Sequence, residues 1–225
     1  MTYRLAIFDF DGTLADTFGW FSRTIEEVGR RWGLDPEARP PLAEMRRLSA
    51  REVIETLRIP AWKLPLVARD MRRRAALAAG EMRLFEGVEE MLARLDEGGV
   101  ALALVSSNGE AAVRGALGPR NAARFRHFSC GAAIFGKSSA FRHTVRRVGV
   151  SPAICIGDEL RDAEAARAAG LAFGAVAWGF TDGDTLEARA RPDYLFTSVS
   201  EIAERLAPIS TAAAGAATEG VTGAR

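Results

Sequence analysis

The chain has 225 residues, and its hydrophobic content of 48% is enough for a packed core domain and a smaller module. A formal net charge of +1 and a pI near 7.8 provide no broad electrostatic field, so we expect neither nucleic acid nor an anionic membrane as a partner. The sequence contains no apolar run long enough for a membrane span and no signal-peptide core ahead of Asp9, which predicts a cytoplasmic protein.

The stretch from Leu5 to Leu14 reads as a buried strand that breaks off into two carboxylates and a glycine. Asp9 and Asp11 are two residues apart, so along an extended strand they point to the same side at a separation of about 7 Å. Carboxylates this close keep their charge most easily around a cation, and Mg²⁺ is the natural candidate because it prefers oxygen ligands. Gly12 lets the backbone turn sharply and approach a ligand closely. The structural alternative is a strand followed by an acidic helix-capping turn.

The segment 16–82 changes character, because its pattern is helical and rich in arginine and it contains no convincing strand. A capping box at Ser49 and Glu52 predicts the start of a helix within it. We interpret this segment as a small inserted all-helical cap. Most of its charges are expected on a solvated surface, and the pair Arg46-Arg47 is the one that we would assign to an anionic substrate.

Strands and helices alternate in the rest of the chain. This alternation predicts an α/β fold, in which a doubly wound parallel sheet of Rossmann-like form is joined by right-handed crossovers. The core is expected at residues 1–15 and 83–207, and the segment 208–225, rich in Ala, Gly, Thr and Ser, is expected as a disordered tail. Strands are expected at Val100–Val105, around Phe128–Cys130, and at Ala153–Ile156, Ala172–Trp178 and Tyr194–Phe196. Helices are expected between Gly87 and Gly98, over Ser139–Val148 and from the end of the Ala153–Ile156 strand up to Gly170. A capping box at Ser198 and Glu201 predicts the start of a last helix.

Polar residues collect where these strands end. Asp9 and Asp11 follow the first strand, Ser106 the second and Asp158 a later one, while Lys137 is expected in a loop. Ligands of open parallel sheets bind outside the carboxyl ends of the strands. The set supplies what phosphoryl transfer requires: a nucleophile, a proton donor, donors to the phosphoryl oxygens and carboxylates for a metal. Taken singly, Ser106 could be a helix N-cap, Lys137 a surface lysine and Asp158 part of an acidic first turn.

A family resemblance rests on these motifs and on their order. The residues Asp9-Phe10-Asp11-Gly12-Thr13, Ser106, Lys137 and Gly157-Asp158-Glu159-Leu160-Arg161-Asp162 resemble the four motifs of the haloacid dehalogenase (HAD) superfamily of hydrolases. The helical insertion after the first motif is similar to the cap of the phosphoglycolate phosphatase-like branch, as are the stretches 175–180 and 191–194. The resemblance covers residues 1 to about 207 and implies a Rossmann-like core with a helical cap.

The resemblance implies a role for each matching residue. Asp9 would attack phosphorus and form an aspartyl-phosphate, while Asp11 would protonate the leaving oxygen and then activate water. Ser106 and Lys137 would bind the phosphoryl oxygens. The remaining substrate-binding positions would be Gly12, Thr13, Ser107, Asn108 and, from the cap, Arg47.

Mg²⁺ is the cofactor that the resemblance implies. Its ligands would be the Asp9 carboxylate, the Asp11 carbonyl and the Asp158 carboxylate. Asp162, one helical turn beyond Asp158, would bind the metal directly, act in its outer shell, or orient Lys137. The two charged residues between these aspartates, Glu159 and Arg161, are expected at the surface or paired with one another.

These roles predict a Mg²⁺-dependent phosphatase for a small phosphorylated metabolite, either a phosphoglycolate-like compound or a sugar phosphate. Asp11 favours phosphate esters over haloacids, because a dehalogenase has no oxygen leaving group to protonate. Three alternatives stay open: a phosphonatase that uses Lys63, the only lysine of the cap, a phosphomutase, and a catalytically weak member that binds a phospho-ligand or partner through its cap. The fold alone does not choose among them.

Overall fold

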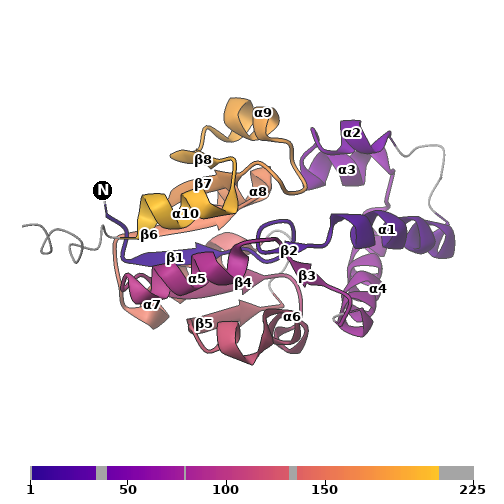
Figure 1. The fold of residues 1–225 in the computed structure, drawn as a ribbon. Coiled ribbons are helices and arrows are strands. Elements are labelled where there is room, and N and C mark those ends of the chain that lie inside the picture. Colours follow the sequence, from indigo (N-terminus) through magenta and orange to yellow (C-terminus); the bar gives the residue numbers. More distant parts are fainter. Residues whose placement is uncertain (1, 34–39, 79, 132–135, 208–225) are drawn as a thin grey trace, which may run out of the picture.

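The computed structural model describes residues 2–33, 40–78, 80–131 and 136–207 (Figure 1). Its core is a parallel sheet of six strands in the spatial order β5-β4-β1-β6-β7-β8, with β5 at Phe125–Cys130, β4 at Ala101–Ser106, β1 at Leu5–Phe8, β6 at Ala153–Gly157, β7 at Ala172–Val176 and β8 at Tyr194–Phe196. The first strand of the chain lies in the middle of the sheet, where Ile7 is opposite Ala103 on one side and Cys155 on the other. The residues that follow β1 are therefore flanked by the ends of β4 and β6.

Helices cover both faces of the sheet. Residues of β1 alternate between two buried clusters, with Ala6 and Phe8 in one and Leu5 and Ile7 in the other. The first cluster includes residues of α5 (Val88–Glu97), α6 (Glu110–Ala122) and α10 (Val199–Leu206), and the second includes residues of α7 (Lys137–Val148) and α8 (Leu160–Ala169). Burial on both sides explains why these strands are continuous apolar runs in the sequence, and it confirms the predicted doubly wound α/β fold.

The predicted core elements are present, but several of their bounds differ, and the strand expected over Ala172–Trp178 ends at Val176. The strand expected around Phe128–Cys130 already begins at Phe125. Lys137, expected in a loop, is the first residue of α7, because Gly136 takes the N-cap position and the helix begins earlier than its apolar stripe. The capping box predicted at Ser198 is wrong, since the Ser198 side chain makes no capping hydrogen bond although α10 begins at the next residue.

The segment 16–82, which we call the cap, is helical as predicted. It contains α1 (Phe18–Trp32), α2 (Leu42–Met45), α3 (Ala50–Thr56), η1 (Ala61–Lys63) and α4 (Leu64–Leu77), which lie beyond the carboxyl end of β1 in Figure 1. The capping box at Ser49 is confirmed: the Glu52 amide donates to Ser49 Oγ at 3.3 Å, and the Ser49 amide donates to Glu52 Oε2 at 2.6 Å. A short antiparallel ladder of β2 (Ala15–Asp16) and β3 (Arg83–Leu84) joins the two chain crossings between cap and core, so the segment includes one strand residue that the sequence pattern missed.

Two short elements, α9 (Gly183–Thr185) and η2 (Leu186–Ala190), lie between β7 and β8 in the chain. In Figure 1 α9 lies on the same side of the molecule as α2 and α3 of the cap. The predicted disordered tail, residues 208–225, lies outside the described residues. Within the described ranges, no helix combines the length and apolar character that a membrane crossing requires.

Candidate active site

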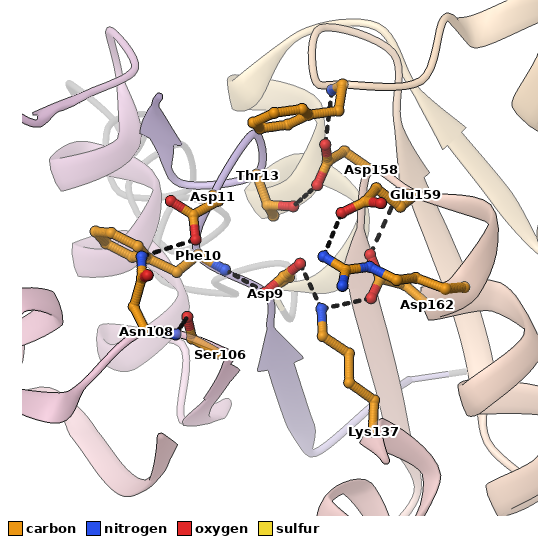
Figure 2. Close-up of polar contacts among 12 residues, drawn as sticks. Asp9, Phe10, Asp11, Thr13, Ser106, Asn108, Lys137, Asp158, Glu159 and Asp162 are labelled. Carbon is orange, nitrogen blue, oxygen red and sulfur yellow. Dashed lines mark hydrogen bonds and ion pairs between the residues drawn. The ribbon is translucent and has the colours of Figure 1, made fainter. Parts of the chain in front are cut away.

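Three adjacent strands bring the predicted residues together. Asp9 and Asp11 follow the end of β1, Ser106 is the last residue of β4, and Asp158 follows β6 directly. Since β1 lies between β4 and β6, these side chains meet at one edge of the sheet, as Figure 2 shows. The strand itself ends at Phe8, before both aspartates. Asp9 and Asp11 therefore lie in the turn after the strand, not along an extended strand as their spacing predicted.

Lys137 bridges two of the aspartates. Its Nζ lies 2.5 Å from Asp9 Oδ2 and 2.6 Å from Asp162 Oδ1, and all three side chains are buried. The other oxygen of Asp9, Oδ1, accepts a hydrogen bond from the Phe10 amide at 2.8 Å. Lys137 is thus a buried member of the site, and the alternative of a surface lysine is excluded.

Asp158 is held by neutral donors in a tight space. Thr13 Oγ1 donates to its Oδ1 at 2.8 Å, and the Phe180 amide donates to its Oδ2 at 2.7 Å. Two glycines make room for this carboxylate, because a Cβ at Gly12 would lie 2.2 Å from Asp158 Oδ2 and a Cβ at Gly179 would lie 2.2 Å from Asp158 Cβ. Gly12 therefore lies against Asp158, while its predicted close approach to a ligand stays a prediction.

Asp11 and Ser106 are linked through Asn108. The Asn108 side-chain amide donates to Asp11 Oδ2 at 2.8 Å, and its backbone amide donates to Ser106 Oγ at 3.0 Å. Ser106 is fully buried, and α6 has Gly109 as its N-cap, so the alternative of Ser106 as a helix N-cap is excluded. Ser107 lies between these two residues and is partly exposed.

Burial and charge oppose one another at these carboxylates. Burial raises the pKa of Asp9 to about 7, although the charge of Lys137 works against the rise. Burial also raises the pKa of Asp11, and it raises the pKa of Asp158 well above its usual range, with Glu159 and Asp9 adding to the effect. Burial alone would lower the pKa of Lys137, but its two carboxylate partners outweigh that cost and raise it, so the ammonium stays charged.

Arg161 contributes charge that the sequence interpretation missed. It forms the predicted ion pair with Glu159, but neither side chain is on the open surface, and the Nε atom of Arg161 is buried. Its positive charge lowers the pKa of Asp9 and of Asp11, against the effect of burial. The motif indicated only that Arg161 precedes Asp162 on α8, and because neighbouring residues of a helix do not share a face, this spacing did not place its charge at the site.

The carboxylates of Asp9, Asp158 and Asp162 suit a hard cation. One oxygen from each lies within 4.8 Å of the others, and all three residues are buried. Lys137 neutralises part of this charge through Asp9 and Asp162, whereas the donors to Asp158 within the described residues, Thr13 Oγ1 and the Phe180 amide, are uncharged. A divalent ion such as Mg²⁺ fits this donor set, since it prefers oxygen ligands and offsets the excess negative charge.

The cap arginines face different partners. Arg47, the predicted substrate residue, has a side chain that is 75% exposed, with its Nε 4.0 Å from Asp182 Oδ2. Arg46 instead reaches the core, where its Nη2 donates to the Gly179 carbonyl at 2.9 Å. The sequence interpretation did not assign a role to Gly179 or Phe180, although both lie in the stretch 175–180 that carried part of the family resemblance.

Comparisons with known proteins agree with this architecture. Residues 6–176 match the model of the haloacid dehalogenase-like hydrolase family. A phosphoglycolate phosphatase of Synechococcus elongatus is 33% identical over 200 residues, which cover 87% of this chain and 93% of the relative, and one of Xanthomonas campestris is 31% identical over 80% and 86%. A crystal structure of a predicted phosphatase from Clostridium acetobutylicum has the same fold, with a TM-score of 0.76, 19% identity and coverage of 91% and 98%. The chain therefore belongs to the haloacid dehalogenase-like hydrolase family, in its phosphoglycolate phosphatase-like branch.

Proposed function

We propose that the protein is a Mg²⁺-dependent phosphatase that hydrolyses a small phosphomonoester through an aspartyl-phosphate intermediate. The observation that carries the proposal is the placement of Asp9, which lies at the end of the central strand with one oxygen against the Phe10 amide and the other against Lys137. Such contacts orient the carboxylate, and the general acid candidate Asp11 follows two residues later in the same turn. Relatives named phosphoglycolate phosphatase support the same reaction class.

In the first step, an oxygen of Asp9 forms a bond to phosphorus while the bond between phosphorus and the leaving alcohol oxygen breaks. Asp11 gives its proton to that oxygen. In the second step, Asp11 takes a proton from water, the water oxygen bonds to phosphorus, and the bond to Asp9 breaks, which releases inorganic phosphate and restores both carboxyl groups. The raised pKa of Asp11 and its hydrogen bond from Asn108 suit a group that must gain and lose a proton in each cycle.

The remaining residues would bind the phosphoryl group and neutralise its negative charge. Lys137 would donate to the phosphoryl oxygens together with Ser106 and the amides of Ser107 and Asn108. Gly12 and Thr13 are also proposed at the substrate, although the Thr13 hydroxyl is engaged with Asp158 in this structure. Mg²⁺, when bound by the Asp9 carboxylate, the Asp11 carbonyl and the Asp158 carboxylate, would supply positive charge against the phosphate. For Asp162 we favour the role of orienting Lys137, because its Oδ1 lies 2.6 Å from Nζ.

The proposed substrate is a small phosphorylated metabolite, either phosphoglycolate-like or a sugar phosphate, and the proposed location is the cytoplasm. Arg47 stays a proposed substrate contact. One observation counts against the phosphonatase alternative: Lys63 donates to the Trp32 carbonyl at 2.6 Å and lies over the Trp62 ring, so its amine is engaged within the cap. A binding role without turnover remains the second candidate, and it is separated by the experiment below.

The test is hydrolysis of p-nitrophenyl phosphate by the wild type and by Asp9→Asn, each with Mg²⁺ and with EDTA. We expect the wild type to turn over only with Mg²⁺, and Asp9→Asn to lose activity by about a thousandfold or more, because an amide cannot form the acyl phosphate. Asp184→Asn, which makes the same chemical change at an exposed carboxylate of α9, should keep wild-type turnover. Equal turnover by Asp9→Asn and wild type would refute Asp9 as the nucleophile, and no release of phosphate from any phosphomonoester would favour the binding role.

A further inference from the structure

The loop 178–182, which follows β7, surrounds the Asp158 carboxyl group. The Phe180 amide donates to Asp158 Oδ2 at 2.7 Å, and the Thr181 amide donates to the Asp158 carbonyl at 3.3 Å. Gly179 packs so closely that only a residue without Cβ fits beside the Asp158 side chain. We call residues 178–182 the bridging loop, and its backbone fixes where the Asp158 carboxylate lies.

The same loop is bound by the cap through Arg46. Arg46 Nη2 donates to the Gly179 carbonyl at 2.9 Å, and the Asp182 amide donates back to the Arg46 carbonyl at 3.0 Å. The Arg46 guanidinium also lies over the Phe18 ring, 5.5 Å from its centroid. Phe180 packs edge-to-face against the rings of Phe18 and Phe21, both in α1 of the cap, with centroid distances of 5.3 and 5.1 Å.

One peptide group connects the cap arginine to the aspartate. The carbonyl of Gly179 and the N–H of Phe180 belong to the same peptide bond, which is planar, so the direction of the carbonyl fixes the direction of the N–H. Arg46 holds the carbonyl end and Asp158 accepts from the N–H end. A cation on the carbonyl also polarises the group and makes its N–H a stronger donor to the carboxylate.

We propose that Arg46 is a positioning residue for the metal site: by holding the Gly179–Phe180 peptide, it orients the amide that sets the Asp158 carboxylate, and so strengthens Mg²⁺ binding. This inference rests on the proposed function for its assignment of Mg²⁺ to Asp158. Because linkage is reciprocal, Mg²⁺ at Asp158 also strengthens the contact between Arg46 and the loop. The contact of Arg46 with the Gly179 carbonyl and assembly of the metal site are then coupled events, whereas cap contacts that do not touch this peptide are not.

Arg189 provides a matched control, because it joins the same part of the cap to the core without touching this peptide. Its Nη1 donates to the Arg47 carbonyl at 3.0 Å, and its Nη2 lies 3.0 Å from both carboxylate oxygens of Glu52. Removal of either arginine side chain loosens the cap. Only removal of Arg46 leaves the Gly179 carbonyl without its cationic donor.

The first measurement is titration of MgCl₂ into the chelator-treated protein by isothermal titration calorimetry. We expect Arg46→Met to weaken Mg²⁺ binding by about tenfold, a typical coupling between two sites, and Arg189→Met to change it by less than about twofold. Arg46→Lys keeps a cationic donor for a single hydrogen bond and should recover binding to within about threefold of the wild type. Equal weakening by Arg46→Met and Arg189→Met would overturn the inference, because the effect would then belong to cap contact in general.

The second measurement needs neither metal nor turnover. Hydrogen exchange of the Phe180 amide in the metal-free protein should be faster in Arg46→Met than in the wild type and unchanged in Arg189→Met. Unchanged exchange and unchanged Mg²⁺ affinity in a folded Arg46→Met would overturn this inference but not the proposed function. A wild type that binds no Mg²⁺ would instead overturn the metal assignment of the proposed function and the inference with it.

Discussion

Within the described residues, Gly179 is, with Gly12, one of two positions at which the Asp158 side chain leaves no room for a Cβ. A Cβ built there would lie 2.2 Å from Asp158 Cβ and 2.4 Å from its Oδ2, and the Asp158 side chain is fixed by hydrogen bonds and burial. The sequence placed Gly179 within a stretch that resembles the family. It could not reveal the reason for a glycine, because the neighbour that excludes a side chain is 21 residues away in the chain.

We expect Gly179→Ala to lower the free energy of unfolding by roughly 1–3 kcal/mol, because the added methyl group forces the bridging loop or Asp158 to move. Urea denaturation, monitored by circular dichroism, measures this change in the free energy of unfolding. The matched control is Gly115→Ala in α6, where nothing lies within 4 Å of the new Cβ. That change should leave stability unaltered or raise it by about 0.5–1 kcal/mol. Equal stability of both variants would show that the loop accommodates a side chain at Gly179.

At the scale of the element, two identical sequence patterns gave different structures. Ser49 and Glu52 form the predicted capping box at α3, whereas Ser198 and Glu201 do not form one at α10. The Glu201 carboxylate instead accepts from the amide and the hydroxyl of Thr197, at 2.9 and 2.7 Å. Both helices begin where the pattern predicts. The partner of each side chain depends on the residue before the serine, which the four-residue pattern does not include.

The contrast makes a direct prediction. Ser49→Ala should lower the free energy of unfolding by about 1 kcal/mol, because the Glu52 amide loses its acceptor. Ser198→Ala, the same change in the same sequence pattern, should alter it by less than about 0.5 kcal/mol, since its hydroxyl caps nothing. Denaturant unfolding of the two variants and the wild type measures both changes. Similar losses of unfolding free energy in the two variants would contradict the assignment of the two caps.

At the scale of the whole molecule, local patterns predicted the class of the fold but not its arrangement. Alternating apolar runs and helical stripes are enough to predict a parallel sheet covered on both faces. They do not reveal that β1 lies between β4 and β6, which is what brings Asp9, Ser106 and Asp158 together. The contact of Arg46 with Gly179 joins residues 133 positions apart, and no local signal accompanies it.

Cap and core must separate for substrate to enter and product to leave, if the proposed site lies between them. The ladder of β2 and β3 links the two chain crossings, and contacts such as that of Arg189 with Glu52 also join cap and core. The side chains of Glu52 and Arg189 are 38% and 44% exposed, so cysteines at these positions can be reached by a reagent. A covalent link there would hold the cap against the core.

We therefore expect the double variant Glu52→Cys with Arg189→Cys, in a Cys130→Ser background, to lose about tenfold or more of its kcat when joined by a short bismaleimide-type reagent with a cleavable disulfide. Cys155 is buried and needs no replacement. Reduction of the linker should restore turnover, and each single-cysteine variant treated with the same reagent should stay active. Retention of full turnover in the linked protein would mean that substrate reaches Asp9 without separation of cap and core, and that the cap contributes contacts but no gating motion.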